Sequence, residues 1–384
     1  MIVNVLLILF YVFFPMAILY LCRKFPMVNK VGSVVIAYVF GLILGNVGIL
    51  PEASDTIQNY LTMISIPLAI PLLLFSANVK AWFRMAGSTL MSMIAALIAV
   101  IVVVFSGYLI FRSGDLENTW KISGMLVGVY TGGTPNLASL KMMLDVPPDL
   151  YIVTHTYDMI LSSIYLLFLI TLGKTVFSVF LKPFPFKNTD SEITMAQLDG
   201  RDPYKGIFKK RTLMSLSKAL GWSIVIFAFA GAASLLFSDK YQAVVVILLI
   251  TTLGIAFSLN PRINRMEKTF ELGMYFILIF SLVVASMADF SDFSAANNYL
   301  FVYITYVVFG TLIIHFILAR LFKVDTDTLM VTSAAFICSP PFVPVIASAI
   351  RNKQVVISGL TVGIMGYAIG NYLGYFIAQV LKLF

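Results

Sequence analysis

The side chains best suited to bind an ion or a small solute lie deep inside apolar stretches. Thr154, Asp158 and Ser162 recur every four residues, so they are predicted to share one face of a helix. Asp158 lies about two turns inside its apolar run. Burying a carboxylate in a membrane costs free energy, so such a residue usually has a function. It is therefore a candidate to bind sodium or to exchange a proton. The alternative is a purely structural hydrogen bond.

Two other stretches combine polar side chains with helix-breaking residues. The stretch 121–143 holds Gly132 and Gly133 followed by Thr134, and the stretch 328–350 holds adjacent prolines. Glycine frees the backbone and proline removes a hydrogen-bond donor, so both helices are predicted to be interrupted. Unpaired peptide groups are tolerated in a membrane only where they line a cavity or are buried in protein. Paired interruptions therefore indicate a binding site, and the alternative is a simple proline kink. The candidate binding residues in the two stretches are Thr134, Pro135, Asn136, Ser139, Ser339, Pro340 and Pro341.

The composition places these stretches in a membrane. Of the 384 residues, 60% are hydrophobic and 11% are charged, against about 45–50% and about 25% in soluble domains. A chain of this length cannot bury so much apolar surface, which excludes a soluble enzyme, a disordered chain and a nucleic-acid binder despite the net charge of +8. Cys22 and Cys338 lie in apolar runs, which excludes a secreted disulfide framework. The run 2–22 has no basic leader and no small-residue cleavage site, so we expect a retained span.

Twelve apolar runs are long enough to be membrane helices. A β-barrel is disfavoured, because runs such as 95–104 are apolar on every side and do not alternate. The predicted spans are 2–22, 31–50, 58–78, 86–112, 121–143, 150–181, 213–237, 241–258, 269–288, 297–322, 328–350 and 354–383.

The polar linker 182–212 divides the chain into two similar halves, 1–181 and 213–384. Its basic end places it in the cytoplasm. Short sequences match between the halves in the same order, among them VYTGGTPNLASL (129–140) and AFICSPPFVPVI (335–346). The loop after the second span is acidic and its mate after the eighth is basic, which favours inverted repeats of about five helices. The single span 213–237 between them conflicts with inversion, so the number of crossings stays open.

The last span carries a stripe of small residues. Gly366, Gly370 and Gly374 recur every four residues, which predicts close contact with another helix. Asn371 lies beside this stripe and is a further candidate for the binding site.

Three motifs carry a resemblance to a known family. GGTPNLASLKMML, THTYD and SPPFVPVIASAI resemble the uncharacterised bacterial YjcL-like family of integral membrane proteins, over nearly the whole chain. That family is similar in plan to the cation:proton antiporter and anion transporter superfamily, which includes sodium–proton antiporters, bile-acid symporters and sodium–glutamate symporters. The resemblance implies an all-α polytopic protein of the bacterial inner membrane. Its core domain would hold two crossing broken helices, 121–143 and 328–350, and its panel domain would form a homodimer.

The resemblance also implies a role for Asp158, as the counterpart of the ion-binding carboxylate of the antiporters. Its neighbour Tyr157 departs from the paired acidic or Asn-Asp dipeptide of many antiporters, and the matching span of the second half has no obvious lysine. Both departures favour solute symport over cation:proton exchange.

The predicted function is therefore secondary active transport. We expect symport of sodium or protons with a small polar organic solute of amino-acid-like, peptide-like or carboxylate type. The alternative is a cation:proton antiporter. An intramembrane enzyme or a receptor is disfavoured, because His155 and His315 lie far apart in the sequence and no nucleophile elbow is present. The expected partners are the solute or ion, the lipid bilayer and a second copy of the chain, with no nucleic acid and no cofactor beyond a sodium ion at Asp158.

Overall fold

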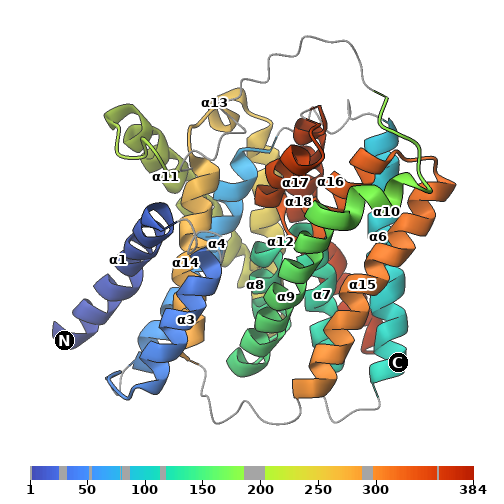
Figure 1. Cartoon of the computed structure of the whole chain (residues 1–384). Coiled ribbons are helices and arrows are strands. Elements are labelled where there is room, and N and C mark those ends of the chain that lie inside the picture. The colour runs from blue at the N-terminus through green and yellow to red at the C-terminus, as the bar shows by residue number, and fades with distance from the viewer. Residues whose placement is uncertain are drawn as a thin grey trace. The chain divides into compact units, whose positions relative to one another are not determined.

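The computed structural model describes residues 2–25, 33–51, 54–77, 79, 87–112, 118–185, 204–287, 297–352 and 354–384. Over these residues the chain is helical apart from its connections and one isolated β-bridge between Lys182 and Asp325 (Figure 1). The helices of the first half are α1 (Ile2–Lys24), α3 (Ser33–Asn46), α4 (Ser54–Phe75), α6 (Gly87–Phe111), α7 (Thr119–Gly132), α8 (Thr134–Met143), α9 (Pro148–Phe168), a π-helical turn (Leu169–Gly173) and α10 (Lys174–Ser178). Those of the second half are α11 (Lys210–Ser234), α12 (Asp239–Ser258), α13 (Pro261–Asn264), α14 (Thr269–Ser286), α15 (Asn297–Leu321), α16 (Thr326–Ile337), a 3-10 turn (Pro340–Phe342), α17 (Val343–Ala349) and α18 (Val355–Leu381).

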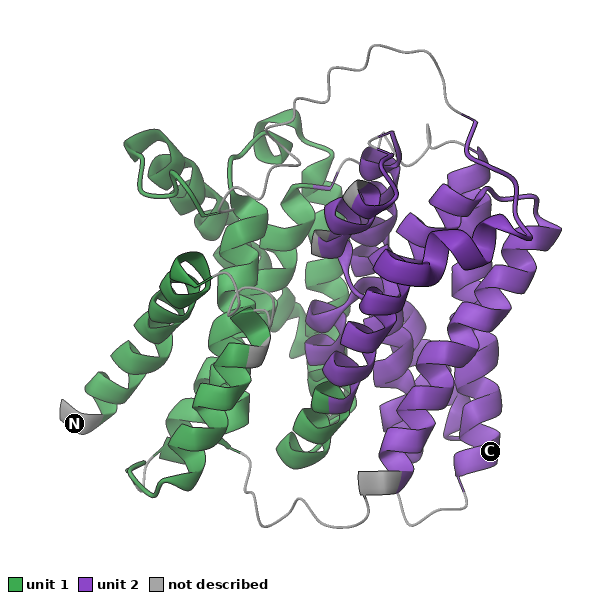
Figure 2. Ribbon diagram, in the orientation of Figure 1, with its two compact units in different colours: residues 1–76, 141–156, 202–297 green, residues 77–140, 157–201, 298–384 purple. Residues whose placement is uncertain are grey.

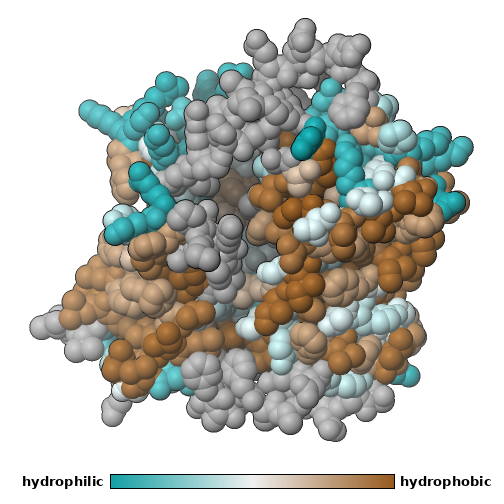
Figure 3. Space-filling view, viewed as in Figure 1, coloured by the Kyte–Doolittle hydropathy of each residue, from teal (hydrophilic) through white to brown (hydrophobic). Residues whose placement is uncertain are grey.

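The helices have the length and polarity of membrane spans. Within the described residues, eight helices are long and apolar enough to cross a bilayer, and shorter apolar helices lie at 36–46, 269–285 and 326–337. Large hydrophobic side chains are exposed along many of them, and hydrophobic residues dominate much of the surface in Figure 3. Such a surface is stable only against lipid or protein, so the prediction of an all-α, multi-pass membrane protein is confirmed.

The chain forms two compact units (Figure 2). Unit 1 contains residues 1–76, 141–156 and 202–297, and unit 2 contains residues 77–140, 157–201 and 298–384. The units do not coincide with the predicted halves, because each half contributes to both. Each predicted repeat gives its first two spans, α3 and α4 or α12 and α14, to unit 1. The later spans of each repeat belong mainly to unit 2, with α9 divided between the units after Thr156.

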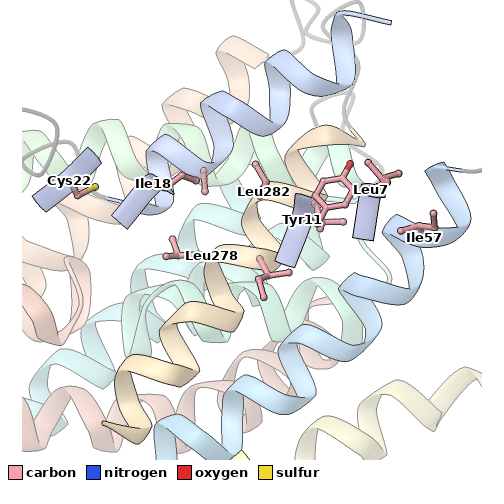
Figure 4. Close-up of a cluster of buried hydrophobic side chains, with 10 residues drawn as sticks. Leu7, Tyr11, Ile18, Cys22, Ile57, Leu278 and Leu282 are labelled. Atoms are coloured by element: carbon pink, nitrogen blue, oxygen red, sulfur yellow. The ribbon is translucent and has the colours of Figure 1, made fainter. Parts of the chain in front are cut away.

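Unit 1 is built around α14, which packs against α1, α3 and α4. One face of α1 is buried in this packing, including Tyr11 and Ile18 (Figure 4). A polar group lies within the same contact: Gln58 donates to the hydroxyl oxygens of Tyr11 at 3.0 Å and Ser286 at 2.9 Å. Gly41 lies against Ala285 and Ser286, so α3 approaches α14 at the distance that only a residue without a Cβ allows.

Unit 2 is built around α18, which packs against α6, α7, α16 and α17. The predicted contact of its glycine stripe is confirmed. A Cβ at Gly366 would lie 3.3 Å from the Cα of Gly132, and a Cβ at Gly374 would lie 2.7 Å from the carbonyl oxygen of Gly124. The backbones of α18 and α7 are therefore in contact along the glycine stripe.

The first interrupted segment folds back on itself. Helix α7 ends at Gly132, and α8 begins at Thr134. A Cβ at Gly128 of α7 would meet the side chain of Leu140 and would lie 3.6 Å from the Cβ of Asn136. In a continuous helix positions 128 and 140 would be about 18 Å apart at 1.5 Å per residue. The chain therefore reverses at Gly133, and α7 and α8 form a first hairpin.

The second interrupted segment reverses in the same way. The ammonium of Lys174 lies 3.3 Å from the carboxylate of Asp327, at the start of α16, and donates to the carbonyl of Ile350, just after α17, at 2.9 Å. Val331 of α16 and Val343 of α17 both lie against Gly359. Helices α16 and α17 with the 3-10 turn between them therefore form a second hairpin.

Both predicted interruptions are present, but the structure differs from the expected pair of crossing helices. Each half-helix packs beside its partner rather than continuing away from it. In the first hairpin the reversal is possible because Gly128 and Gly132 have no side chains, which leaves room for α8 to pack against α7.

Candidate functional site

The tips of the two hairpins meet near the middle of α18. A Cβ at Gly363 would lie 2.9 Å from the Cβ of Pro340, at the tip of the second hairpin, and Gly366 lies against Thr131 and Gly132, at the tip of the first. Positions 363 and 366 are about 4.5 Å apart along a helix axis. The arms of the second hairpin contact α18 before these positions and the arms of the first contact it after them. The hairpins therefore extend in opposite directions from a shared centre within unit 2.

The two tips have the same backbone conformation. Gly133 has φ 82° and ψ −165°, and Ser339 has φ 81° and ψ 157°. These residues occupy equivalent positions in the matched sequences 129–140 and 335–346. They also touch, because a Cβ at Gly133 would lie 3.0 Å from the Cβ of Ser339 and would meet its hydroxyl. The equivalent breaks of the two halves are therefore brought together.

Asp158 lies beside this centre on α9, in the part of the helix that belongs to unit 2. Its side chain is buried, and the Ser162 hydroxyl donates to its Oδ1 at 3.0 Å. Ser162 is tied to the second tip, since its backbone carbonyl accepts from the Cys338 thiol at 3.6 Å. Tyr130, at the last turn of α7, lies near the Asp158 carboxylate. The carboxylate is thus enclosed by the ends of two half-helices.

Several predicted residues stabilise the hairpins directly. The Asn136 amide donates to the carbonyl of Gly366 at 3.0 Å, which fastens α8 to α18. The Ser139 hydroxyl donates to the carbonyl of Pro135 at 2.7 Å within α8. Thr134 is partly buried at the start of α8. These residues therefore shape the first tip.

The remaining predictions fall in different places. Asn371 is fully buried on α18. Pro341 is in the 3-10 turn, and its side chain lies outside the described residues. Thr154 belongs to unit 1, where its hydroxyl donates to the carbonyl of Leu150 at 2.7 Å, so the structure does not place it with the residues of unit 2. His155 is also in unit 1 and packs against the ring of Tyr38 at 4.9 Å between centroids.

Sequence reasoning missed several buried residues near Asp158 and the two hairpin tips. Tyr130 lies three residues before the first break, and Cys338 lies directly before Ser339. The Tyr165 hydroxyl, one turn beyond Ser162, forms a buried hydrogen bond with the hydroxyl of Ser333 on α16. Only position in the sequence could have identified Tyr130, Cys338 and Tyr165, because each lies within one helical turn of a predicted site residue or helix break.

The chemistry of the site fits a hard monovalent cation or a proton. The Asp158 carboxylate and the Ser162 hydroxyl lie beside the C-terminal ends of α7 and α16, and oxygen ligands of this kind hold sodium in interrupted membrane helices. In the part of the chain that the structure describes, no three His, Cys, Asp or Glu side chains cluster as a transition-metal site would require.

The strained backbone of Ser339 leads to a first prediction. Its conformation is one that essentially only glycine adopts, at a cost of about 1–3 kcal/mol. We expect Ser339→Gly to raise the free energy of unfolding by about 1 kcal/mol, after the larger unfolded-state entropy of glycine is subtracted. Thermal unfolding of the purified protein measures this change. Ser339→Ala keeps the strain and is the matched control, so equal stabilisation by both variants would contradict a backbone origin.

Comparison with known proteins places the chain among membrane proteins. Residues 12–384 match the family described as "Protein of unknown function (DUF819)". The chain is also similar to the "Uncharacterized membrane protein YjcL" of Bacillus subtilis (strain 168), with 23% identity over 371 residues that cover 93% of this chain and 91% of the relative.

Proposed function

We propose that this chain, which belongs to the DUF819 family of proteins of unknown function, is a secondary active transporter rather than an enzyme. It would couple the movement of sodium or protons to symport of a small polar organic solute carrying a carboxylate or a similar anionic group. In this proposal the protein works as a homodimer in the bacterial cytoplasmic membrane and needs no resident cofactor. The similarity to a membrane protein and the many apolar helices are compatible with this function.

One observation carries the proposal: two hairpin tips meet beside a buried carboxylate. The C-terminal ends of α7 and α16 present partial negative charge, and the N-terminal end of α8 presents partial positive charge. A cation would bind at Asp158 and the carbonyl ends, and the anionic group of the solute would bind at the N-terminal end of α8, which begins with Thr134. Neutralising both charges in one site gives a physical basis for coupled binding.

The hairpins support inverted repeats, because they make the number of crossings compatible with inversion. A hairpin that returns to the side from which it entered does not cross the membrane. The first repeat then crosses four times, with α3, α4, α6 and α9, and α11 adds a fifth crossing before the second repeat begins. An odd number of crossings inverts the second repeat relative to the first.

Loop charges support the same arrangement. Counting crossings in this way, the connections 25–32, 76–86, 179–209, 259–268 and 350–354 share one side and are net basic, while 322–325 on that side is neutral. The connections 47–53, 112–118, 144–147 and 287–296 share the other side and are net acidic, while 235–238 there is uncharged. Basic loops are retained in the cytoplasm, so the first group would be cytoplasmic.

The division into units supports a transport mechanism in which unit 2 moves as a body. The hairpins and Asp158 belong to unit 2, whereas unit 1 takes the first two spans of each repeat. Transport would proceed by movement of unit 2 relative to unit 1, so that the site faces each side of the membrane in turn.

Uptake by proteoliposomes tests the function. Purified protein is reconstituted, a sodium or proton gradient is imposed, and uptake of radiolabelled amino acids, dipeptides, and mono- and dicarboxylates is measured. We expect at least one solute to accumulate only while the gradient persists, and collapse of the gradient by an ionophore to stop accumulation. Proton release on addition of sodium or potassium, detected by a pH-sensitive dye without any transported solute, would instead establish the cation:proton antiporter. No response in either assay would contradict the transporter proposal.

A further inference from the structure

A polar cleft lies within unit 1 and shares no residue with the hairpins. It is bounded by the first turns of α11 and by the connection that joins α12 to α14 through α13, and its volume is about 570 Å³. Arg211, Lys218 and Trp222 line it from α11, while Arg262 and Arg265 line it from α13 and the residue that follows. Positions 211, 215, 218 and 222 share one face of a helix, so the periodicity of α11 directs these side chains into one cleft.

The cleft is positively charged. Four cations and one carboxylate, that of Glu267, line it. Glu267 is already engaged, since it lies 3.7 Å from the guanidinium of Arg211 and accepts from the Thr212 hydroxyl at 3.3 Å. Lys218, Arg262 and Arg265 form no ion pair with any carboxylate among the described residues. Three cations thus remain to hold an anion.

Apolar side chains line part of the α11 wall of the cleft, between and beyond its cations. Trp222 is 42% exposed, and its ring packs edge-on against Phe257 at 5.3 Å between centroids. Met214 lines the same wall, and large hydrophobic residues continue along α11 at Val225 and Phe229, where both side chains are more than half exposed. A ligand that fits this surface therefore has an anionic head and an apolar tail.

We propose that the cleft binds the headgroup of an anionic phospholipid. Arginine pairs with phosphate oxygens in a bidentate fork, and basic clefts between membrane helices on the cytoplasmic side bind anionic headgroups. Tryptophan side chains are enriched at the level of the lipid headgroups, which suits Trp222, because it lines the same cleft as the four cations. A free phosphate ion would satisfy the arginines but would leave the apolar part of the wall unused, so the observations favour the lipid. The site has no residue in common with the hairpins and does not depend on the transport proposal.

Fluorescence quenching by brominated lipids tests the site with Trp222 as the only tryptophan, excited selectively at a wavelength where tyrosine does not absorb. The full chain carrying Trp82→Phe and Trp120→Phe is reconstituted with brominated phosphatidylglycerol or with brominated phosphatidylcholine, in a background of unbrominated phosphatidylcholine. We expect phosphatidylglycerol to quench at a roughly tenfold lower mole fraction, since each basic group near the headgroups adds a measurable preference for anionic lipid. Arg262→Gln with Arg265→Gln is expected to remove that preference.

Two control experiments complete the test. Lys240→Gln with Lys382→Gln removes two exposed cations elsewhere, and this control is expected to keep the preference. Inorganic phosphate at millimolar concentration is expected to leave quenching unchanged. Equal quenching by both lipids, or an undiminished preference after loss of both arginines, would overturn the proposal. Displacement of the brominated lipid by inorganic phosphate would overturn the lipid assignment in favour of a free anion.

Discussion

Replacing Asp158 by asparagine is expected to weaken ion-dependent uptake severely while leaving the protein folded. Asparagine has nearly the same shape, and its Oδ1 still accepts from Ser162 as the carboxylate does at 3.0 Å. The change removes the negative charge beside the hairpin tips and replaces one acceptor oxygen by an amide NH2 donor. Since a hydrogen bond or ligand bond to a charged group contributes about 1.5–3 kcal/mol, we expect ion affinity to fall by about 10- to 100-fold. Uptake by proteoliposomes as a function of sodium concentration and of pH measures the loss.

Asp149→Asn is the matched control for this experiment. Asp149 lies in the first turn of the same helix and belongs to unit 1, so it carries the same charge without the hairpin environment. Its replacement is expected to change uptake by less than about twofold, because a surface charge at a helix N-terminus contributes little. Ion dependence that is unchanged in Asp158→Asn would contradict the assignment of the ion site. Uptake that remains but no longer responds to a gradient would confirm that Asp158 couples the ion to the solute.

The sequence predicts the elements of this site better than their arrangement. Helix-breaking residues identify both interruptions, because the effects of Gly133 and of Pro340 on a helix are local. The glycine stripe likewise predicts the contact made by Gly366, because a spacing of four residues places small side chains on one face whatever helix they meet. These features depend only on neighbours in the chain.

The reversal at each break depends on contacts between distant residues. Whether α8 continues beyond Gly133 or folds back is decided by the packing of Asn136 and Leu140 against α18 and α7. Nothing in a run of apolar residues specifies that partner, so a broken crossing helix and a hairpin have the same sequence pattern. The number of crossings limits the choice only under the hypothesis of inverted repeats, since the single helix α11 is compatible with inversion only if neither interrupted segment crosses.

Replacing Gly366 by alanine is expected to destabilise unit 2 severely. A Cβ at this position would meet the carbonyl oxygen of Thr131 and would lie 2.8 Å from its carbonyl carbon. Both atoms belong to the backbone of α7, so no side-chain rotation relieves the clash and the helices must separate at the hairpin tip. Separation would also stretch the hydrogen bond from Asn136 to the carbonyl of Gly366. We therefore expect a loss of about 3 kcal/mol or more in the free energy of unfolding, at the upper end of what overpacking costs.

Gly231→Ala tests whether the destabilisation comes from the clash between α18 and α7 or from replacing glycine by alanine in any helix. Gly231 lies in α11 with no atom within 4 Å of the position that a Cβ would take. There the same substitution is expected to stabilise the protein by about 0.5–1 kcal/mol, because alanine has the higher helix propensity. The two changes are therefore expected to move the thermal unfolding temperature in opposite directions. A Gly366→Ala protein that unfolds at the same temperature as the Gly231→Ala protein would show that α7 and α18 do not touch at the hairpin tip, and the site around Asp158 would then lack the close packing that positions it.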